Sequence, residues 1–232
     1  MRLGYHRRRV AWFGAGLKQS KRFAAQERLA PAEAARARQE RLERLLAHAR
    51  ERSAFYRERI PAGPVALEHV PVLEKAEMME RFDDLVTDPR LCRDELLEWI
   101  ETRRRDEFFE DRYRVMTTSG SSGRKGLFVY DRAGWAAIGG QFLRGSAWMG
   151  LRPAIPRRRL AMFGGGSLTH MSSQGAATLR VGVHNVLGLP ATLPVEEQVA
   201  ALNRFRPQFL NAYASVALRS PRSRRRGGCG SR

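Results

Sequence analysis

The sequence predicts an α/β protein with a helical N-terminal region. Apolar residues recur at helical spacing in three segments before residue 112. Beyond that point, short β-branched and aromatic runs alternate with longer helix-like segments, which is the pattern of a sheet covered by helices. Clusters of Gly and Pro separate the segments. We therefore divide the chain into four parts: a basic leader segment (1–25), a helical region (26–112), an α/β region (113–218) and a tail (219–232).

The helical region is expected to contain three helices that serve as scaffold. The first spans 31–60, where four residues fall on one face: Leu42, Leu45, Leu46 and Ala49. The second lies between Leu73 and Asp88, and the third covers 94–102. Each is followed by a proline-containing break or a polar stretch.

The α/β region is expected to alternate strands with helices. Strand-like runs lie at 113–116, 127–130, 159–163, 181–189 and 208–211. Helix-like runs lie at 131–150 and 195–205, and a further helix begins at 214–218. The triplet Gly164-Gly165-Gly166 lacks the G-x-G-x-x-G spacing of a dinucleotide site, because position 169 is Thr, and it is expected to form a tight strand-to-helix turn.

Charge is concentrated at the two ends of the chain. The 232 residues carry a formal net charge of +18, and 38 of the 42 basic residues are Arg. Residues 1–26 hold seven basic residues, 219–232 hold six Arg, and neither segment contains an acid. The excess of Arg over Lys indicates the codon usage of a GC-rich genome. Because the basic residues lie outside the patterned regions, they are a weak argument for a binding surface.

Composition excludes several classes of protein. Two cysteines cannot supply a disulfide framework or a four-thiolate zinc site, and we predict no metal site. No run approaches the roughly 18 apolar residues of a membrane span. A cytoplasmic protein without a membrane span is expected.

The tail uses only Arg, Ser, Gly, Pro and Cys, so it has no apolar surface to bury and is predicted to be disordered. It begins just after the helix that starts at 214–218. We therefore hypothesise that the reading frame or the gene model breaks near Leu218.

The most informative stretch is the turn at 117–126, between two strand-like runs. Its glycines allow close backbone approach, and its hydroxyls and N–H groups can form an anion-binding nest beside Arg124 and Lys125. The candidate phosphate-binding residues are Thr118, Ser119, Gly120, Ser121, Ser122, Gly123 and Lys125. The spacing differs from a Walker loop, and a strand follows instead of a helix. A Gly/Ser linker is the alternative, although linkers usually lack strand-like flanks.

The segment 118–123 resembles the phosphate-loop signature of the AMP-binding, adenylate-forming enzymes. The segments 45–57, 70–75 and 202–215 are similar to the phenylacetate-CoA ligase-like, CapK-related branch, so the resemblance covers about 30–218. It implies that 113–218 is part of the large N-terminal α/β domain of such an enzyme, a nucleotide-binding subdomain carrying the phosphate loop.

Such enzymes use ATP and magnesium to convert a carboxylate to an acyl-adenylate, and then transfer the acyl group to a thiol such as coenzyme A. The resemblance therefore implies ATP, magnesium and coenzyme A as cofactors, and a carboxylate substrate and a CoA-type thiol as partners. It assigns the β- and γ-phosphates to 118–123, with Lys125 as the positive charge. His170 could line the acyl pocket, as a histidine in this region does in some relatives; a packed structural histidine is the alternative.

The later motifs of these enzymes do not occur in the chain. An aromatic-Gly-x-Thr-Glu segment, the ribose-binding Asp, the hinge and the small C-terminal domain with its catalytic Lys are all missing. The sequence is therefore expected to be a truncated N-terminal portion without ligase activity of its own. Two alternatives stay open: a basic nucleic-acid-binding protein, with nonspecific contacts through the Arg-rich tail, and a degenerate, non-catalytic nucleotide-binding subunit.

Overall fold

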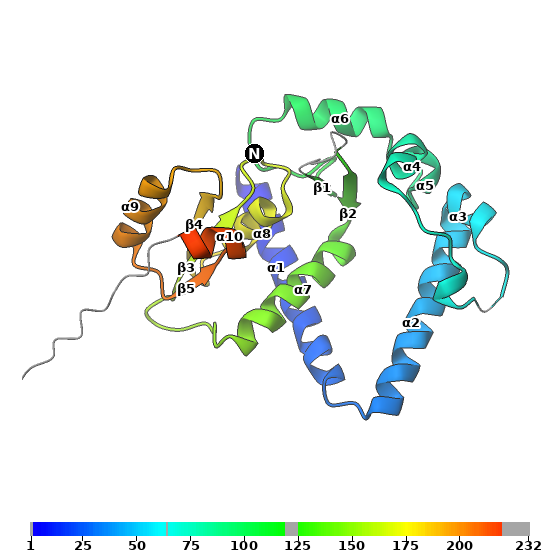
Figure 1. Ribbon diagram of the computed structural model, residues 1–232, viewed down its shortest axis with the longest axis horizontal. Helices are drawn as coiled ribbons and strands as arrows, with labels where there is room; N and C mark the ends of the chain where they lie inside the picture. The colour runs from blue at the N-terminus through cyan, green and yellow to red at the C-terminus, as the bar shows by residue number, and fades with distance from the viewer. Residues whose placement is uncertain (1, 64, 119–124, 220–232) are drawn as a thin grey trace, which may run out of the picture.

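The computed structural model describes residues 2–63, 65–118 and 125–219 and shows a mixed α/β arrangement (Figure 1). This confirms the coarse fold class. The tail beyond residue 219 and the predicted phosphate-loop residues Ser119, Gly120, Ser121, Ser122 and Gly123 lie outside the described residues. No helix in the described ranges is both long and apolar enough to cross a bilayer.

The predicted leader forms a long helix, α1 (Arg2–Gln26), that packs into the body of the protein. It crosses α7 (Arg132–Trp148) (Figure 1). Trp12 of α1 is only 5% exposed and packs in a cluster with Phe108, Met116 and Trp135. The leader is therefore part of the core.

Helices dominate the chain up to residue 102. They are α2 (Pro31–Arg52), α3 (Ala54–Arg59), the 3-10 helix η1 (Leu67–His69), α4 (Lys75–Glu80), α5 (Phe82–Leu85) and α6 (Arg93–Thr102). The three predicted helices are confirmed in position, although breaks at Ser53 and Arg81 divide the first two. Ser53 is buried and accepts a hydrogen bond from the Tyr56 amide, which caps α3.

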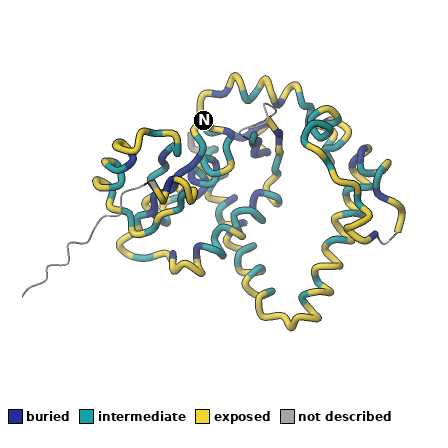
Figure 2. Tube along the Cα trace, viewed as in Figure 1, coloured by how far each residue is buried: buried dark blue, intermediate teal, exposed yellow. Residues whose placement is uncertain are grey.

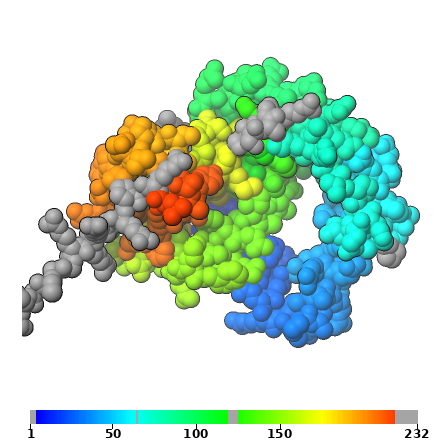
Figure 3. Space-filling view, in the orientation of Figure 1, coloured from blue at the N-terminus to red at the C-terminus, as the bar shows by residue number. Residues whose placement is uncertain are grey.

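The predicted apolar stripe of α2 does not reach a core. No α2 residue is buried, and Leu45 is 62% exposed. Figure 2 shows the helix exposed or half-buried along its length, and in Figure 3 it stands apart from the α/β body. The helical periodicity is confirmed. Of the predicted stripe, Leu42, Leu46 and Ala49 are half-buried and Leu45 is exposed, so the face is only partly covered, because periodicity does not specify what covers a face.

The strands on either side of the 118–126 turn form an antiparallel hairpin. In it β1 (Arg114–Thr117) pairs with β2 (Leu127–Tyr130), and Thr117 lies opposite Leu127. The hairpin packs on α5 and α6 in a second core cluster: Phe82, Leu91, Leu96, Phe109, Tyr113, Val115 and Leu127. The two predicted strands are confirmed, and residues 119–124 between them lie outside the described residues.

A separate parallel sheet has the strand order β4-β3-β5. Its strands are β3 (Arg159–Gly164), β4 (Asn185–Pro190) and β5 (Phe209–Asn211), and its helices are α8 (Met171–Leu179), α9 (Val195–Phe205) and α10 (Ala214–Arg219). Leu160 and Met162 pack with residues of α7 and α8, whereas Phe163 packs with residues of α9 and α10. The helices therefore cover both faces of the sheet.

One strand begins later than predicted. Residues 181–184 form a turn, and β4 starts at Asn185. Gly182 has φ +90°, which lies outside the extended conformation of a strand, so the predicted strand over 181–189 is wrong in its first four residues.

The crossing of α1 and α7 depends on glycines at the contact. A Cβ atom built on Gly140 would lie 2.9 Å from Cβ of Gln19 and 3.0 Å from the backbone nitrogen of Ser20. On the same helix, a Cβ atom on Gly145 would have no atom within 4 Å. We predict that Gly140→Ala is less stable than Gly145→Ala by about 1–3 kcal/mol, because overpacking at a backbone contact forces the helices apart.

Urea unfolding of both variants measures this difference. Because both replacements gain the same helix propensity, the comparison isolates the packing effect. Equal free energies of unfolding would show that α1 does not lie against α7 at this point.

The hydrogen bond between Tyr113, just before β1, and Asp88 leads us to expect that the protein loses stability at alkaline pH. The Tyr113 hydroxyl donates to Asp88, whose carboxylate is also bound by Arg90. Burial, followed by the bond to Asp88, raises the pKa of Tyr113 to about 12 from its ordinary value of 10.0. The folded state favours the neutral phenol, so this stabilisation is complete below pH 10 and is lost as the pH rises through about 12.

Unfolding free energies measured between pH 10 and pH 12 are expected to fall less steeply in Tyr113→Phe than in the wild type. Tyr56→Phe is the matched control, because the Tyr56 hydroxyl makes no hydrogen bond within the described residues. Identical slopes in Tyr113→Phe and the wild type would contradict the assignment.

Candidate functional site

The base of the predicted phosphate turn is closed by two hydrogen bonds. The Thr118 amide donates to the Gly126 carbonyl at 3.0 Å, and the Gly126 amide donates to Thr118 Oγ1 at 2.8 Å. The hydroxyl hydrogen of Thr118 stays available to a ligand. Lys125 is exposed beside this closure. Of the predicted turn residues, the structure thus places Thr118 and Lys125 together at the base.

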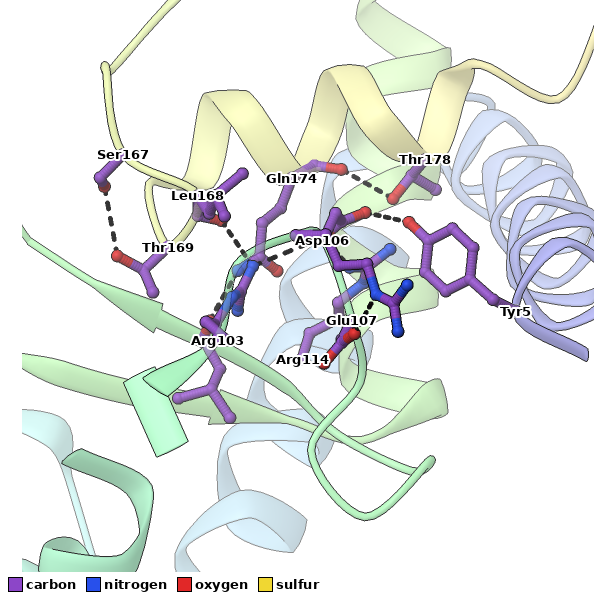
Figure 4. Close-up of polar contacts among 12 residues, drawn as sticks. Tyr5, Arg103, Asp106, Glu107, Arg114, Ser167, Leu168, Thr169, Gln174 and Thr178 are labelled. Atoms are coloured by element: carbon purple, nitrogen blue, oxygen red, sulfur yellow. Dashed lines mark hydrogen bonds and ion pairs between the residues drawn. The ribbon is translucent and has the colours of Figure 1, made fainter. Parts of the chain in front are cut away.

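The same end of β1 is joined to the turn that follows β3. The Thr117 amide donates to the Thr169 carbonyl at 3.1 Å, and the two threonine Oγ1 atoms lie 2.6 Å apart. Thr169 also contacts the Ser167 hydroxyl at 3.2 Å (Figure 4). Thr117 and Thr169, 52 residues apart in sequence, therefore lie side by side.

The turn after β3 is as tight as the sequence predicts. The Gly165 amide donates to Ser172 Oγ at 3.0 Å, and the Ser173 hydroxyl donates to the Gly165 carbonyl at 2.7 Å. His170 caps α8, and its Nδ1 lies 2.7 Å from Ser172 Oγ. A Cβ atom on Gly165 would fall 2.3 Å from Cγ of His170, so glycine is required there. The predicted strand-to-helix turn is confirmed.

An apolar cavity of about 420 Å³ lies next to this turn, among α1, α7, α8 and the sheet. Its apolar wall includes Trp12, Phe13, Trp135, Phe142, Leu143 and Met162. Its polar lining includes His170 and Ser172, which follow β3, Asn211, which ends β5, and Tyr213, two residues further on. Ser172 Oγ lies 3.5 Å from the Tyr213 hydroxyl. The cavity is therefore apolar along its walls and polar where the two strands end.

The strand order explains why the polar groups meet there. The chain leaves β3 through α8 to β4 on one side, and returns through α9 to β5 on the other side of β3. In open parallel sheets, a crevice forms beyond the carboxyl ends of the strands where the connections diverge, and ligands bind in it. His170 and Tyr213 lie at that point of divergence.

Sequence reasoning identified His170 as a possible pocket residue but missed the aromatic wall. Trp12 and Phe13 belong to the segment interpreted as a leader, and they line the cavity because α1 packs on α7. The only signal in the sequence was the apolar run at 10–17, which a local pattern cannot assign to a distant pocket.

Comparison with protein-family models, curated proteins and solved structures found no match to this chain. Within 2–63, 65–118 and 125–219, no three His, Cys, Asp or Glu side chains are grouped as potential metal ligands.

We predict different effects for two neighbouring glycines of the turn. Gly165→Ala must displace the His170 ring, whereas the nearest atom to a Cβ on Gly166 is Thr192 Oγ1 at an ordinary 3.6 Å. Gly165→Ala is expected to destabilise the protein by about 1–3 kcal/mol and to weaken binding of an apolar dye such as Nile red in the cavity. Gly166→Ala should retain both properties.

Urea unfolding and fluorescence titration measure the two effects, and the imidazole NMR signals of His170 report the displacement of the ring. If Gly165→Ala bound the dye like the wild type and left these signals unchanged, the described packing of His170 would be wrong.

Proposed function

We propose that this chain supplies the polyphosphate- and acyl-binding parts of an adenylate-forming ligase that resembles the phenylacetate-CoA ligases. The observation that carries the proposal is the Thr117–Thr169 contact, which joins the base of the phosphate turn to the His170 end of the apolar cavity. Activation of a carboxylate by ATP requires the carboxylate to approach the α-phosphate. The phosphate-binding turn and the acyl-binding cavity must therefore lie next to each other.

The turn offers donors suited to a polyphosphate. Thr118 keeps its hydroxyl hydrogen, and Lys125 is exposed at the base of the turn. Hydrogen bonds to a charged group contribute about 1.5–3 kcal/mol each. Three or four of them account for roughly the 8 kcal/mol of a micromolar complex. Because magnesium binds largely through substrate phosphates and water, it would accompany ATP and need few protein ligands.

The cavity suits the apolar part of a carboxylic acid. Its volume of about 420 Å³ is within the range of small-molecule sites, about 300–1,000 Å³. Aromatic walls from Trp12, Phe13 and Trp135 favour a flat or bulky apolar group. The polar side chains at the ends of β3 and β5 would face the carboxylate, on the side of the phosphate turn. Coenzyme A is the expected acyl acceptor by resemblance alone.

Removing either group at the base of the turn is expected to weaken ATP binding. We predict that Thr118→Val and Lys125→Gln each lower the affinity for Mg-ATP roughly tenfold, because each loses about 1.5 kcal/mol or more of charge-assisted hydrogen bonding. Isothermal titration calorimetry measures the affinities. The matched controls Thr102→Val and Lys21→Gln replace exposed residues far from the turn in the sequence and should bind like the wild type.

Wild-type affinity in both turn variants, or no ATP binding by the wild-type chain, would contradict the proposal. Carboxylate-dependent ATP–pyrophosphate exchange, assayed with arylacetic and medium-chain acids, separates a ligase from a nucleotide-binding subunit without chemistry. Since the later motifs do not occur in the sequence, we expect ATP binding without exchange.

A further inference from the structure

A single carboxylate lies between two buried arginines. The side chains of Arg103 and Arg114 are 2% and 1% exposed. Asp106 Oδ1 lies 2.5 Å from Arg114 Nη1 and 3.7 Å from Arg103 Nη2, and Asp106 Oδ2 accepts from the Tyr5 hydroxyl (Figure 4). Asp106 thus faces two buried positive charges. Glu107 also attracts Arg103, but Glu107 pairs with Arg105.

The two guanidinium groups are incompletely satisfied. Nε and Nη1 of Arg103 and Nε of Arg114 are buried without a hydrogen-bond partner. Burial lowers the pKa of Arg103, and it also lowers the pKa of Arg9, a half-buried neighbour. Burying a charge is costly unless the charge is paired and hydrogen-bonded. The cluster therefore has an excess of positive charge, which an additional anion would balance.

A second cavity, of about 240 Å³, lies beside the cluster. Its lining includes Asp106, the glycine turn 164–166, Ser167, Leu168, Arg180 and Gly188. The Leu168 carbonyl accepts from Arg103 Nη2 at 3.1 Å, so the wall of the cavity rests directly on the buried cluster. Asp106 also lines the cavity, but its negative charge is already paired with Arg114 and Arg103, and it accepts a hydrogen bond from the Tyr5 hydroxyl.

Arg180, an exposed residue at the end of α8, also lines this cavity. Its Nη2 would lie 2.8 Å from a Cβ atom on Gly188, so it sits directly over that glycine. No side-chain hydrogen bond or ion pair of Arg180 is found among the described residues. An arginine that reaches from the end of α8 over Gly188 of β4, with buried positive charge beside the cavity, is an arrangement suited to an anion.

We propose that this second cavity binds a phosphate-type oxyanion. Arg180 contacts the anion, and the positive excess of Arg103 and Arg114 holds it in place from behind. The volume lies below the range of about 300–1,000 Å³ for larger ligands, which favours inorganic phosphate or the single phosphate group of a larger molecule. This site is distinct from the 118–126 turn and does not rest on the proposed function.

Isothermal titration calorimetry of the full chain with inorganic phosphate, against chloride at constant ionic strength, tests the site. Arg180→Gln is expected to lower the phosphate affinity at least about tenfold, since it removes the direct charged donor. The matched control Arg152→Gln changes an exposed arginine outside the cavity lining and should bind phosphate like the wild type. Circular dichroism confirms that both variants fold.

Gly188→Ala tests the geometry without removing charge. Its methyl group would displace the Arg180 guanidinium, so it should also weaken phosphate binding. Lys125→Gln should leave this affinity unchanged, which separates the cavity from the phosphate turn. Equal losses in Arg180→Gln and Arg152→Gln, a dependence on Lys125 in place of Arg180, or no phosphate binding by the wild type would overturn the proposal.

Titrations with AMP and adenosine distinguish the two sources of the phosphate group. An Arg180-dependent preference for AMP over adenosine supports the phosphate of a larger ligand. If phosphate binding depends on Arg180 and AMP binding does not, the site takes the free anion.

Discussion

The carboxylate of Asp106 is the contact on which the arrangement of this protein depends. It lies in the connection between α6 and β1, where it accepts from Tyr5 of α1 and pairs with Arg114 of β1. Arg103, its third partner, also donates to the Leu168 carbonyl in the turn after β3. The N-terminal helix, the hairpin and the parallel sheet therefore meet at one negative charge. Since breaking a buried pair leaves a charge unbalanced, at a cost of about 3–5 kcal/mol, these segments are held in one relative position.

Hydrogen bonds on both sides of α8 also fix the position of the apolar cavity relative to β1 and α7. Gln174, fully buried on α8, donates to the Val115 carbonyl of β1 at 2.6 Å, and the Trp135 indole of α7 donates to Thr178 at 3.1 Å. The phosphate turn continues from β1, and the apolar cavity lies against α7 and α8. The position of the strand end at Thr117 relative to the cavity is thus set by buried hydrogen bonds between regular elements, which would give the proposed binding of two ligand groups a rigid support.

Sequence patterns predicted the features that depend on residues close together in the chain. The helix over 195–205, the strands flanking the turn and the strand-to-helix glycines follow from spacing and turn chemistry. What the sequence did not predict is long-range: the packing of α1 on α7 through Gly140, the incomplete covering of the α2 stripe, and the separation of the hairpin from the parallel sheet. The turn could be recognised as a candidate site because its residues are contiguous. The cavity could not, since Trp12 and Met162 are brought together only by the fold.

Two arginines of the N-terminal helix, Arg8 and Arg9, show why net charge alone is a poor guide to function here. Arg8 pairs with Asp111, and Arg9 donates to the carbonyls of Ala177 and Arg180, where α8 leaves unpaired acceptors and the negative end of its dipole. Cations used in this way stabilise the fold and are not free to bind a nucleic-acid backbone. The side chain of Arg180 differs, because it has no acceptor within the part of the chain that the structure describes, and it lines a cavity beside buried positive charge. The position of an arginine relative to its acceptors, more than the number of arginines, indicates where an anion binds.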